Sequence, residues 1–228
     1  MVLSIDDFFR ERTMPKLVCG TGTDYDSVAA IDLEYLSVCV RQMLADEPAL
    51  LPKFDFVTGR RAGYSEYHST PDDIIVFEGI QAVYPEVVAL FEGYPFRSIF
   101  VCVDDDITVN GTLFTREEIR LSRRIVRDYR SRSASPEFTL DVWDSVRKNE
   151  EKSIFPYMHG CDYILNSLLP FEVFMIGQYA IPLLETVPES SPHFAAAAAM
   201  REKYLSLRGN EIDPSCLAPE SLYHEFLG

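Results

Sequence analysis

Short apolar runs rich in β-branched residues recur along the chain, and acidic side chains follow most of them. Runs of four or five such residues are typical of strands buried on both faces, as in a parallel sheet. The runs are residues 2–5 before Asp6, 74–77 before Glu78, 99–103 before the acids 104–106, and 163–166.

Between these runs, apolar positions repeat with the period of a helix. The predicted helices are 27–45, 85–92, 115–129, 137–148 and 170–184, with two appended helices at 195–207 and 219–227. Strand and helix alternate, so the pattern predicts an α/β fold. In open α/β sheets the ligand site lies beyond the carboxyl ends of the strands. Acids collect at three of those ends, which indicates a metal and general-base site.

Composition and charge narrow the class of protein. With 228 residues, of which 47% are hydrophobic, the chain is long enough for one main globular domain. Its formal net charge of −15 argues against a nucleic-acid partner, because phosphate backbones bind to a surplus of Lys and Arg. The five cysteines lack CxxC spacing, and no stretch approaches the ~18 apolar residues of a membrane span. We therefore expect a soluble, cytoplasmic protein without a membrane partner, and leave a homo-oligomer open.

Two acids at predicted strand ends are candidates for metal and proton-transfer chemistry. Asp6 would project into the crevice, where a carboxylate accepts a hydroxyl proton or holds Mg²⁺. Glu78 before Gly79 follows the Walker-B-like pattern, in which the acid meets the Mg²⁺ of a nucleoside triphosphate. The plainer alternatives are that Asp6 or Asp7 caps the next turn and that Glu-Gly merely ends a strand.

The segment 115–132 is unusually rich in arginine. At ~100° per residue, five of its arginines fall within roughly one quarter of the helix circumference, opposite an apolar side that ends in Tyr129. Clustered guanidinium groups repel one another, whereas a polyphosphate would neutralise them, so the pattern predicts a phosphate clamp. The alternative is a solvated face offset by acids, with Asp128 reaching Arg124 and Arg132. The segment's arginines are Arg116, Arg120, Arg123, Arg124, Arg127, Arg130 and Arg132.

Other motifs carry little weight. The glycines near residues 20–23 lack a following Lys-Ser/Thr and a leading strand, so we expect a turn rather than a phosphate loop. The four histidines show no metal-ligand spacing, and no Gly-x-Ser-x-Gly signature is present.

Five segments together resemble the uridine kinase and phosphoribulokinase family, bacterial uridine kinases in particular. They stand in the family's order and spacing between residue 1 and about 185, with further likeness at 150–156. The segments are Ser-Ile-Asp-Asp-Phe-Phe at 4–9, Tyr-Asp at 25–26, Pro-Lys-Phe-Asp-Phe at 52–56, Val-Phe-Glu-Gly-Ile at 76–80, and Arg-Leu-Ser-Arg-Arg-Ile-Val-Arg-Asp at 120–128.

The resemblance implies transfer of a phosphoryl group from ATP, with Mg²⁺, to the hydroxyl of a uridine-like nucleoside. Asp6 would be the catalytic base and a magnesium ligand, and Glu78 the second magnesium-side acid. Substrate contacts are implied for Tyr25, Asp26, Phe54 and Arg124, and a lid over the phosphates for Arg120, Arg123, Arg127 and Arg132.

This sequence also departs from the family pattern. Gly59, Ala134 and Val142 stand where uridine-cytidine kinases carry a base-reading histidine, an arginine and a glutamine, and Phe9 replaces a tyrosine. The segment 107–115 is longer than the corresponding turn. Ribose and phosphate handling are therefore expected to persist, whereas pyrimidine recognition is left open.

The family's opening strand, its Gly-x-x-x-x-Gly-Lys-Ser/Thr loop and its first helix have no counterpart in this sequence. The resemblance thus implies a P-loop NTPase-like parallel sheet, flanked by helices, without those three elements and with exposed apolar edges. The expected layout is a kinase core at 1–186, including the lid helix 115–132, and a C-terminal helical extension at 187–228. Two alternative functions remain: a pseudokinase or truncated fragment that binds nucleoside but not ATP, and a kinase for another small sugar-alcohol acceptor.

Overall fold

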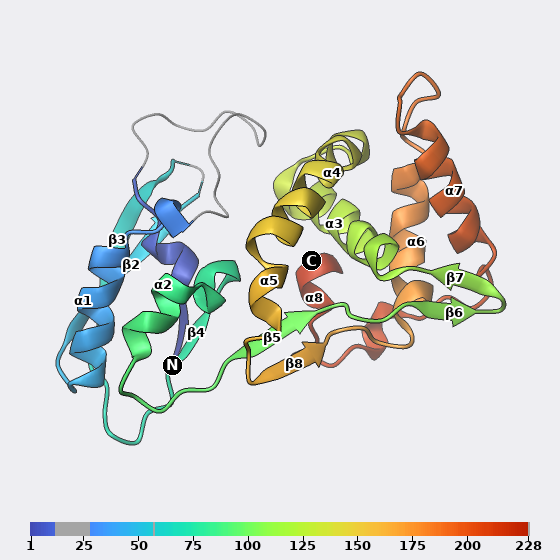
Figure 1. The fold of residues 1–228 in the computed structure, drawn as a ribbon. Helices are drawn as coiled ribbons and strands as arrows, with labels where there is room; N and C mark the ends of the chain where they lie inside the picture. The colour runs from blue at the N-terminus through green and yellow to red at the C-terminus, as the bar shows by residue number, and fades with distance from the viewer. Residues whose placement is uncertain (12–27, 57, 228) are drawn as a thin grey trace. The chain divides into compact units, whose positions relative to one another are not determined.

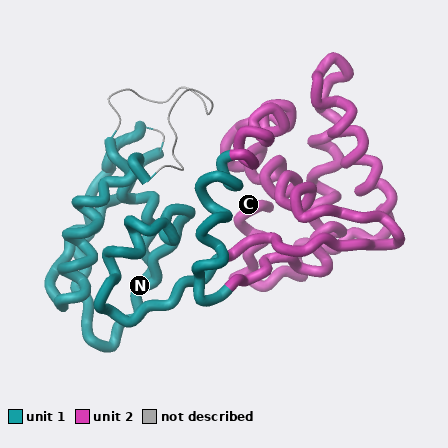
Figure 2. Tube along the Cα trace, in the orientation of Figure 1, with its two compact units in different colours: residues 1–100, 149–163 teal, residues 101–148, 164–228 magenta. Residues whose placement is uncertain are grey.

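The computed structural model describes residues 1–11, 28–56 and 58–227, and the chain forms two compact units (Figures 1 and 2). Unit 1 comprises residues 1–100 and 149–163, and unit 2 comprises 101–148 and 164–228. The division does not follow the expected boundary at residue 186. The C-terminal helices lie in the same unit as the arginine-rich helix, and the layout expected from the sequence stays a prediction.

Unit 1 combines a short parallel sheet with an antiparallel hairpin. Strands β1 and β4 pair in parallel, with Ser4 opposite Glu78, and β2 and β3 pair as the hairpin. The elements are β1 (Val2–Ser4), η1 (Ile5–Phe8), η2 (Val28–Ala30), α1 (Leu33–Leu44), β2 (Ala49–Asp55), β3 (Arg60–Tyr67), β4 (Val76–Glu78), η3 (Ile80–Val83), α2 (Pro85–Val88), η4 (Ala89–Phe91) and α5 (Phe155–Met158).

Unit 2 is mainly helical. Its elements are β6 (Ile107–Val109), β7 (Thr112–Phe114), α3 (Arg116–Arg132), α6 (Glu172–Leu184), α7 (Phe194–Leu205), η5 (Pro214–Cys216) and α8 (His224–Leu227). Three elements span the points of division: β5 (Ile99–Cys102), α4 (Pro136–Ser153) and β8 (Tyr163–Asn166). Strands β5 and β8 pair with each other.

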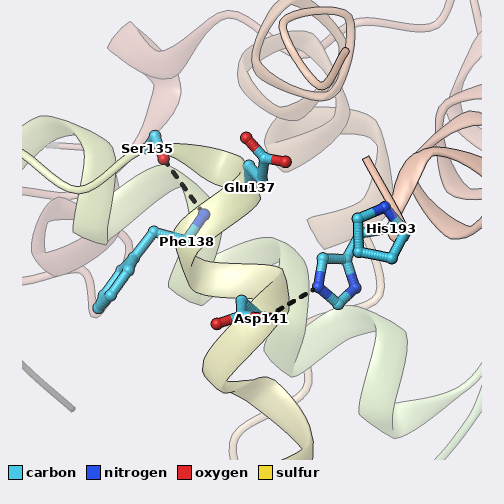
Figure 3. Close-up of a pocket in the computed structure, with 6 residues that line it drawn as sticks. Ser135, Glu137, Phe138, Asp141 and His193 are labelled. Atoms are coloured by element: carbon cyan, nitrogen blue, oxygen red, sulfur yellow. Dashed lines mark hydrogen bonds and ion pairs between the residues drawn. The ribbon is translucent and has the colours of Figure 1, made fainter. Parts of the chain in front are cut away.

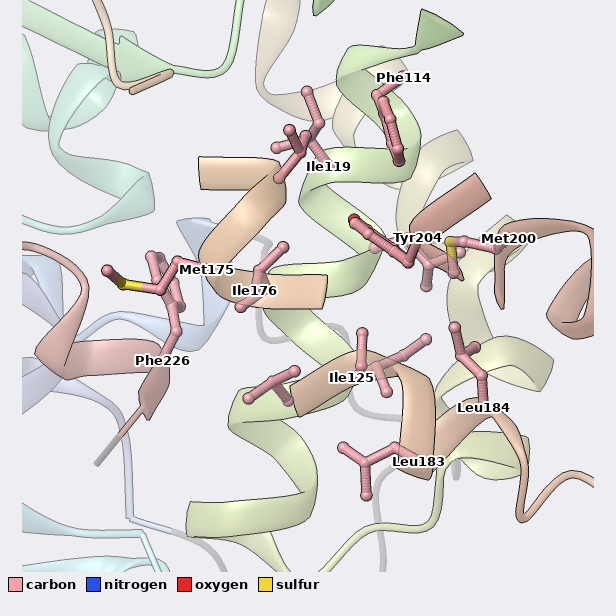
Figure 4. Packing of buried hydrophobic residues seen from close by; sticks show 14 of the residues in the cluster. Phe114, Ile119, Ile125, Met175, Ile176, Leu183, Leu184, Met200, Tyr204 and Phe226 are labelled. Carbon is pink, nitrogen blue, oxygen red and sulfur yellow. The ribbon is translucent and has the colours of Figure 1, made fainter. Parts of the chain in front are cut away.

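Each unit has its own hydrophobic core. In unit 1 the core lies among β1, η1, α1 and β2, with Ile5, Phe8 and Leu36 fully buried. In unit 2 it lies among α3, α6 and α7, where Ile125, Ile176 and Tyr204 pack together (Figure 4). These cores form where the helical period places apolar residues on one side, as in α3 and α6.

The predicted α/β class and most predicted elements are confirmed, with three corrections. The helix expected at 27–45 begins only at Leu33, after its N-cap Asp32, and the one expected at 219–227 is only His224–Leu227. The hairpins β2–β3 and β6–β7 were not anticipated. The apolar strands are not buried on both faces. Exposed strand residues include Val2, Val76, Ile99, Val101 and Leu165.

Two further observations concern the part of the chain that the structure describes. None of its helices combines the length and apolar character needed to span a bilayer. Its cysteines are unbridged, namely Cys39, Cys102, Cys161 and Cys216.

Candidate functional site

Asp6 and Glu78 lie at the carboxyl ends of neighbouring parallel strands. Asp6 belongs to η1, which begins directly after β1, and Glu78 is the last residue of β4. Gly79, which follows, has φ +137°, and a Cβ there would stand 3.2 Å from Cβ of Ile5 and 3.7 Å from Oδ1 of Asp6. Glycine therefore permits both the backbone turn and the close approach of η1. The topology brings the two acids to one edge of the sheet, as the sequence predicted.

The neighbouring acid, Asp7, has a structural role. Its Oδ1 accepts a hydrogen bond from the Phe54 N–H at 2.9 Å, and its Oδ2 lies 3.3 Å from Nζ of Lys53. Asp7 thus ties η1 to β2. Neither Asp6 nor Asp7 is the N-cap of η1, a position held by Ser4 without a side-chain cap. Asp7 therefore anchors η1 to β2, whereas Asp6 lies at the sheet edge beside Gly79.

Phe54 is a core residue at the base of an aromatic cluster. Only 4% of it is exposed, and its ring packs 5.8 Å from Phe9 and 5.3 Å from Phe56, centroid to centroid. Phe56 is 53% exposed. Any substrate contact expected of Phe54 would therefore be made at the margin of this cluster, where Phe56 presents the accessible ring.

An ion pair joins helix α1 to the hairpin of the same unit. Nη2 of Arg61 lies 2.7 Å from Oδ2 of Asp32, and its guanidinium stacks over Tyr35 with 4.7 Å to the ring centroid. Burial alone would raise the pKa of Asp32, but the bonds from Arg61 and the Tyr35 N–H lower it below its ordinary value. Asp32 is therefore held as a carboxylate that caps α1 and fixes β3.

Helix α3 begins as its sequence predicts. Thr115 and Glu118 form a capping box, with the Glu118 N–H donating to Thr115 Oγ1 and the Thr115 N–H donating to Glu118 Oε2. The helix ends at Ser133, which adopts a left-handed conformation with φ +54°. Its predicted extent, 115–132, is confirmed to within one residue.

Asp128 is the shared counterion of three arginines on α3. Its carboxylate lies 3.2 Å from Arg124 Nε, 3.9 Å from Arg127 Nε and 3.1 Å from Arg132 Nη1, and its side chain is only 6% exposed. Partial burial lowers the pKa of Arg132, and the like charge of Arg127 lowers it further. The contacts that the alternative reading assigned to Asp128 are confirmed, yet three guanidinium groups still share one carboxylate.

Arg123 is buried and does not lie on the exposed arginine face. Its Nε and Nη2 pair with the carboxylate of Glu172, the latter at 2.7 Å, and Nη2 also donates to the Ser167 carbonyl at 2.8 Å. Burial alone would lower the pKa of Arg123, but the Glu172 carboxylate raises it above its ordinary value. We therefore do not assign phosphate binding to Arg123. Its counterion, Glu172, lies on α6, and the helical pattern of α3 alone does not reveal it.

The remaining arginines differ in their surroundings. Arg120 stacks over Trp143, 5.6 Å to the ring centroid, and Arg116 lies 3.6 Å from Oδ1 of Asp104. Tyr129, expected on the apolar side, is 53% exposed. The face opposite the arginines is thus less apolar than the spacing predicted.

Arg127 has a partner that no local pattern indicates. Its Nη1 lies 2.8 Å from Oε1 of Glu225, on α8. Because 98 residues separate the two, no motif or helical spacing connects them, and the contact becomes evident only in the fold.

The predicted residues thus fall into two groups. Asp6, Glu78 and Phe54 lie in unit 1, and the arginines of α3 lie in unit 2. Tyr25 and Asp26 lie outside the described residues. The assignments in each group remain proposals.

A shallow surface pocket of unit 2 contains none of the predicted residues. Between α4 and the start of α7, Nε2 of His193 lies 3.3 Å from Oδ1 of Asp141, and the Phe138 N–H donates to Ser135 Oγ at 3.2 Å (Figure 3). These polar groups satisfy one another.

Within the described residues, no group of three or more His, Cys, Asp or Glu side chains is placed to hold a metal ion. Magnesium in phosphoryl-transfer sites is commonly held by one or two carboxylates together with water and substrate phosphates. The oxygen donors of Asp6 and Glu78 at one sheet edge fit that demand.

Comparisons with known proteins agree with the family resemblance, and the family match below covers four of the five motif segments, all but residues 4–9. The profile described as "Phosphoribulokinase / Uridine kinase family" matches residues 16–172. A uridine kinase of Lactobacillus helveticus is 29% identical over 166 residues, which are 72% of this chain and 71% of that protein. "Uridine kinase-like protein 4" of Arabidopsis thaliana is 30% identical over 129 residues, 56% of this chain and 24% of that protein. A uridine kinase of Streptococcus pyogenes serotype M5 is 27% identical over 143 residues, 63% of this chain and 61% of that protein. The chain thus covers less than two thirds of the latter two relatives.

Proposed function

The chain belongs to the phosphoribulokinase and uridine kinase family, and on that premise we propose that it transfers the γ-phosphoryl group of ATP, with Mg²⁺, to a hydroxyl of a nucleoside. The observation that supports this most is the meeting of Asp6 and Glu78 at the ends of two paired parallel strands. This is where open α/β sheets bind their ligands. The family match supplies the reaction class.

Asp6 is proposed to accept the proton of the acceptor hydroxyl. A carboxylate within hydrogen-bond reach of the acceptor hydroxyl takes its proton as the oxygen attacks phosphorus. Bound Mg²⁺ would neutralise charge on the transferring phosphates, and Glu78 with Asp6 would hold it. Asp7 keeps η1 in place through the Phe54 N–H, so the adjacent acids have separate duties. Tyr25 and Asp26 are proposed to hold the nucleoside.

The arginines of α3 are proposed to bind the phosphates. Arg124, Arg127 and Arg132 share the single carboxylate of Asp128, so their summed charge is not cancelled there. Guanidinium groups bind phosphate oxygens in a bidentate manner, and closing over them excludes water. Arg120 is kept in this group as a further phosphate contact, and Arg124 also as a substrate contact.

One observation favours a second candidate function. The 228 residues contain no Gly-x-x-x-x-Gly-Lys-Ser/Thr loop, which in P-loop enzymes cradles the phosphates of ATP. Transfer by the proposed route requires that loop from residues outside this sequence. A non-catalytic protein that binds nucleoside without ATP would not need it.

The test compares catalysis with binding in the same protein. In a protein that carries a Gly-rich phosphate loop together with these 228 residues, transfer of ³²P from labelled ATP to uridine, cytidine and a panel of sugar alcohols is measured with Mg²⁺, and nucleoside binding is measured by calorimetry. We expect Asp6→Asn to abolish transfer while leaving acceptor binding largely intact. Asp7→Asn is the matched control, because it makes the same chemical change one residue away and should retain turnover.

The outcomes separate the candidates. Asp26→Ala should weaken acceptor binding more than it slows turnover. Nucleoside binding without any transfer would favour the non-catalytic function, and transfer to a sugar alcohol but not to nucleosides would favour the other acceptor class. Full turnover in Asp6→Asn would show that the proposed base is wrong.

A further inference from the structure

The C-terminal segment packs on the arginine-rich helix. Helix α8 contacts α3 within unit 2, and Tyr223, Phe226 and Leu227 are 0%, 7% and 4% exposed. The guanidinium of Arg123 lies 5.1 Å from the ring centroid of Phe226. The aromatic and aliphatic side chains therefore anchor this segment, and the family match, which ends at residue 172, does not include it.

Glu225 lies among these anchors but is not buried with them. Its side chain is 53% exposed, and Oε1 is 2.8 Å from Nη1 of Arg127, whose own side chain is 23% exposed. Burial of the anchors accounts for the docking of α8, because apolar area removed from water is its main stabilising contribution. The Glu225 carboxylate adds little to that docking, since ion pairs open to solvent are weak.

The carboxylate occupies the position that an anionic ligand of Arg127 would take. Carboxylate and phosphate oxygens accept the same hydrogen bonds from a guanidinium group. A phosphate that reaches Arg127 must therefore displace Glu225 or share the guanidinium with it. Asp128, at 3.9 Å from Arg127 Nε, is much more buried and stays in place as the permanent counterion.

We propose that Glu225 is an internal competitor for phosphate at Arg127, so that the C-terminal segment weakens polyphosphate binding to α3. The inference rests on the proposed function, in which Arg127 contacts phosphate. Because the Glu225 side chain is 53% exposed, its ion pair with Arg127 is weak and the competition is modest. Removing the carboxylate should tighten binding roughly two- to fivefold, about 0.4–1 kcal/mol at ~1.4 kcal/mol per tenfold.

Binding of inorganic tripolyphosphate, measured by titration calorimetry at low salt, tests the proposal directly. Glu225→Gln should tighten binding two- to fivefold, and Glu225→Ala should do the same if the glutamine variant folds poorly. Glu220→Gln is the matched control: Glu220 is exposed in the same segment, the charge change is identical, and affinity should stay within the error of wild type. Adding Arg127→Ala to Glu225→Gln should remove the gain.

The results distinguish this inference from the proposed function. If Arg127→Ala weakens tripolyphosphate binding but Glu225→Gln and Glu225→Ala bind like wild type, the competition is refuted and the phosphate role of Arg127 stands. If Arg127→Ala has no effect, both are refuted. An equal gain in Glu220→Gln would attribute the effect to net charge and also refute the competition.

Discussion

Replacing Arg123 by methionine should destabilise unit 2 instead of weakening phosphate binding. The side chains of Arg123 and Glu172 are 8% and 0% exposed, and the guanidinium also bonds to the Ser167 carbonyl at 2.8 Å. Methionine fills much of the same space but leaves the Glu172 carboxylate buried without its cation. Removing one partner of a buried ion pair typically costs about 3–5 kcal/mol.

The double variant Arg123→Met with Glu172→Met separates the charge effect from packing. Replacing both ions by apolar groups of similar volume is often neutral or stabilising, because neither charge then has to be desolvated. The double variant should therefore recover most of the stability that Arg123→Met loses. A residual cost would report lost hydrogen bonds to Ser167.

Urea unfolding followed by the fluorescence of Trp143 measures the effect. Trp143 is the chain's one tryptophan and lies in the part of α4 that belongs to unit 2, so its signal reports that unit. Arg208→Met is the control, because Arg208 is exposed and surface substitutions usually stay within about 0.5 kcal/mol. A loss in Arg123→Met below about 1 kcal/mol, no larger than the control, would refute the reasoning.

Three further substitutions test other parts of the fold. Gly177→Ala should lower the free energy of unfolding by about 1–3 kcal/mol, measured by urea unfolding, because its Cβ would lie 2.7 Å from Cδ1 of the buried Tyr204. The same substitution usually stabilises a helix, so a stabilised variant would contradict the packing. The lowered pKa of Asp32 contributes stability above its unfolded value near pH 4, and this is lost as the pH falls through the lower folded value. Asp32→Asn should therefore flatten the acid limb of an unfolding titration, and an unchanged limb would exclude the ion pair with Arg61. Gly111→Ala should destabilise the β6–β7 hairpin by about 1 kcal/mol, measured by amide exchange, because φ is +80° there; unchanged exchange would argue against that turn.

Local signals predicted the elements that depend on nearby residues. The spacing of apolar residues such as Ile119 and Val126 predicted the buried side of α3, and both residues are fully buried. The hairpin β6–β7 also has a local signal: Asn110-Gly111 between short β-branched strands is a typical two-residue turn, and both residues have positive φ.

Strand burial could not be predicted from the apolar runs alone. A run such as 99–103 fits a strand covered on both faces, but coverage depends on which neighbours the fold provides. Val101 is 57% exposed, and β5 pairs only with β8 among the described residues. The same limit applies to the arginines: Arg123 and Arg124 are adjacent and chemically identical, yet Glu172, 49 residues from Arg123, buries one of them.

The two groups of candidate residues are therefore encoded differently. Asp6 and Glu78 follow from topology, because acids after adjacent parallel strands meet at one edge whatever the loops do. The net charge of the arginine group depends on its counterions. Arg124, Arg127 and Arg132 are paired with Asp128 and Glu225, which leaves a net charge of +1. Displacing Glu225 raises this net charge to +2. A multiply charged phosphate is attracted more strongly to the arginine group without Glu225 than to the group with it. Its affinity should then fall as salt screens the exposed arginines, and should fall more steeply in Glu225→Gln than in Glu220→Gln, since only the former frees Arg127. Parallel salt dependences would refute the competition by Glu225 at Arg127.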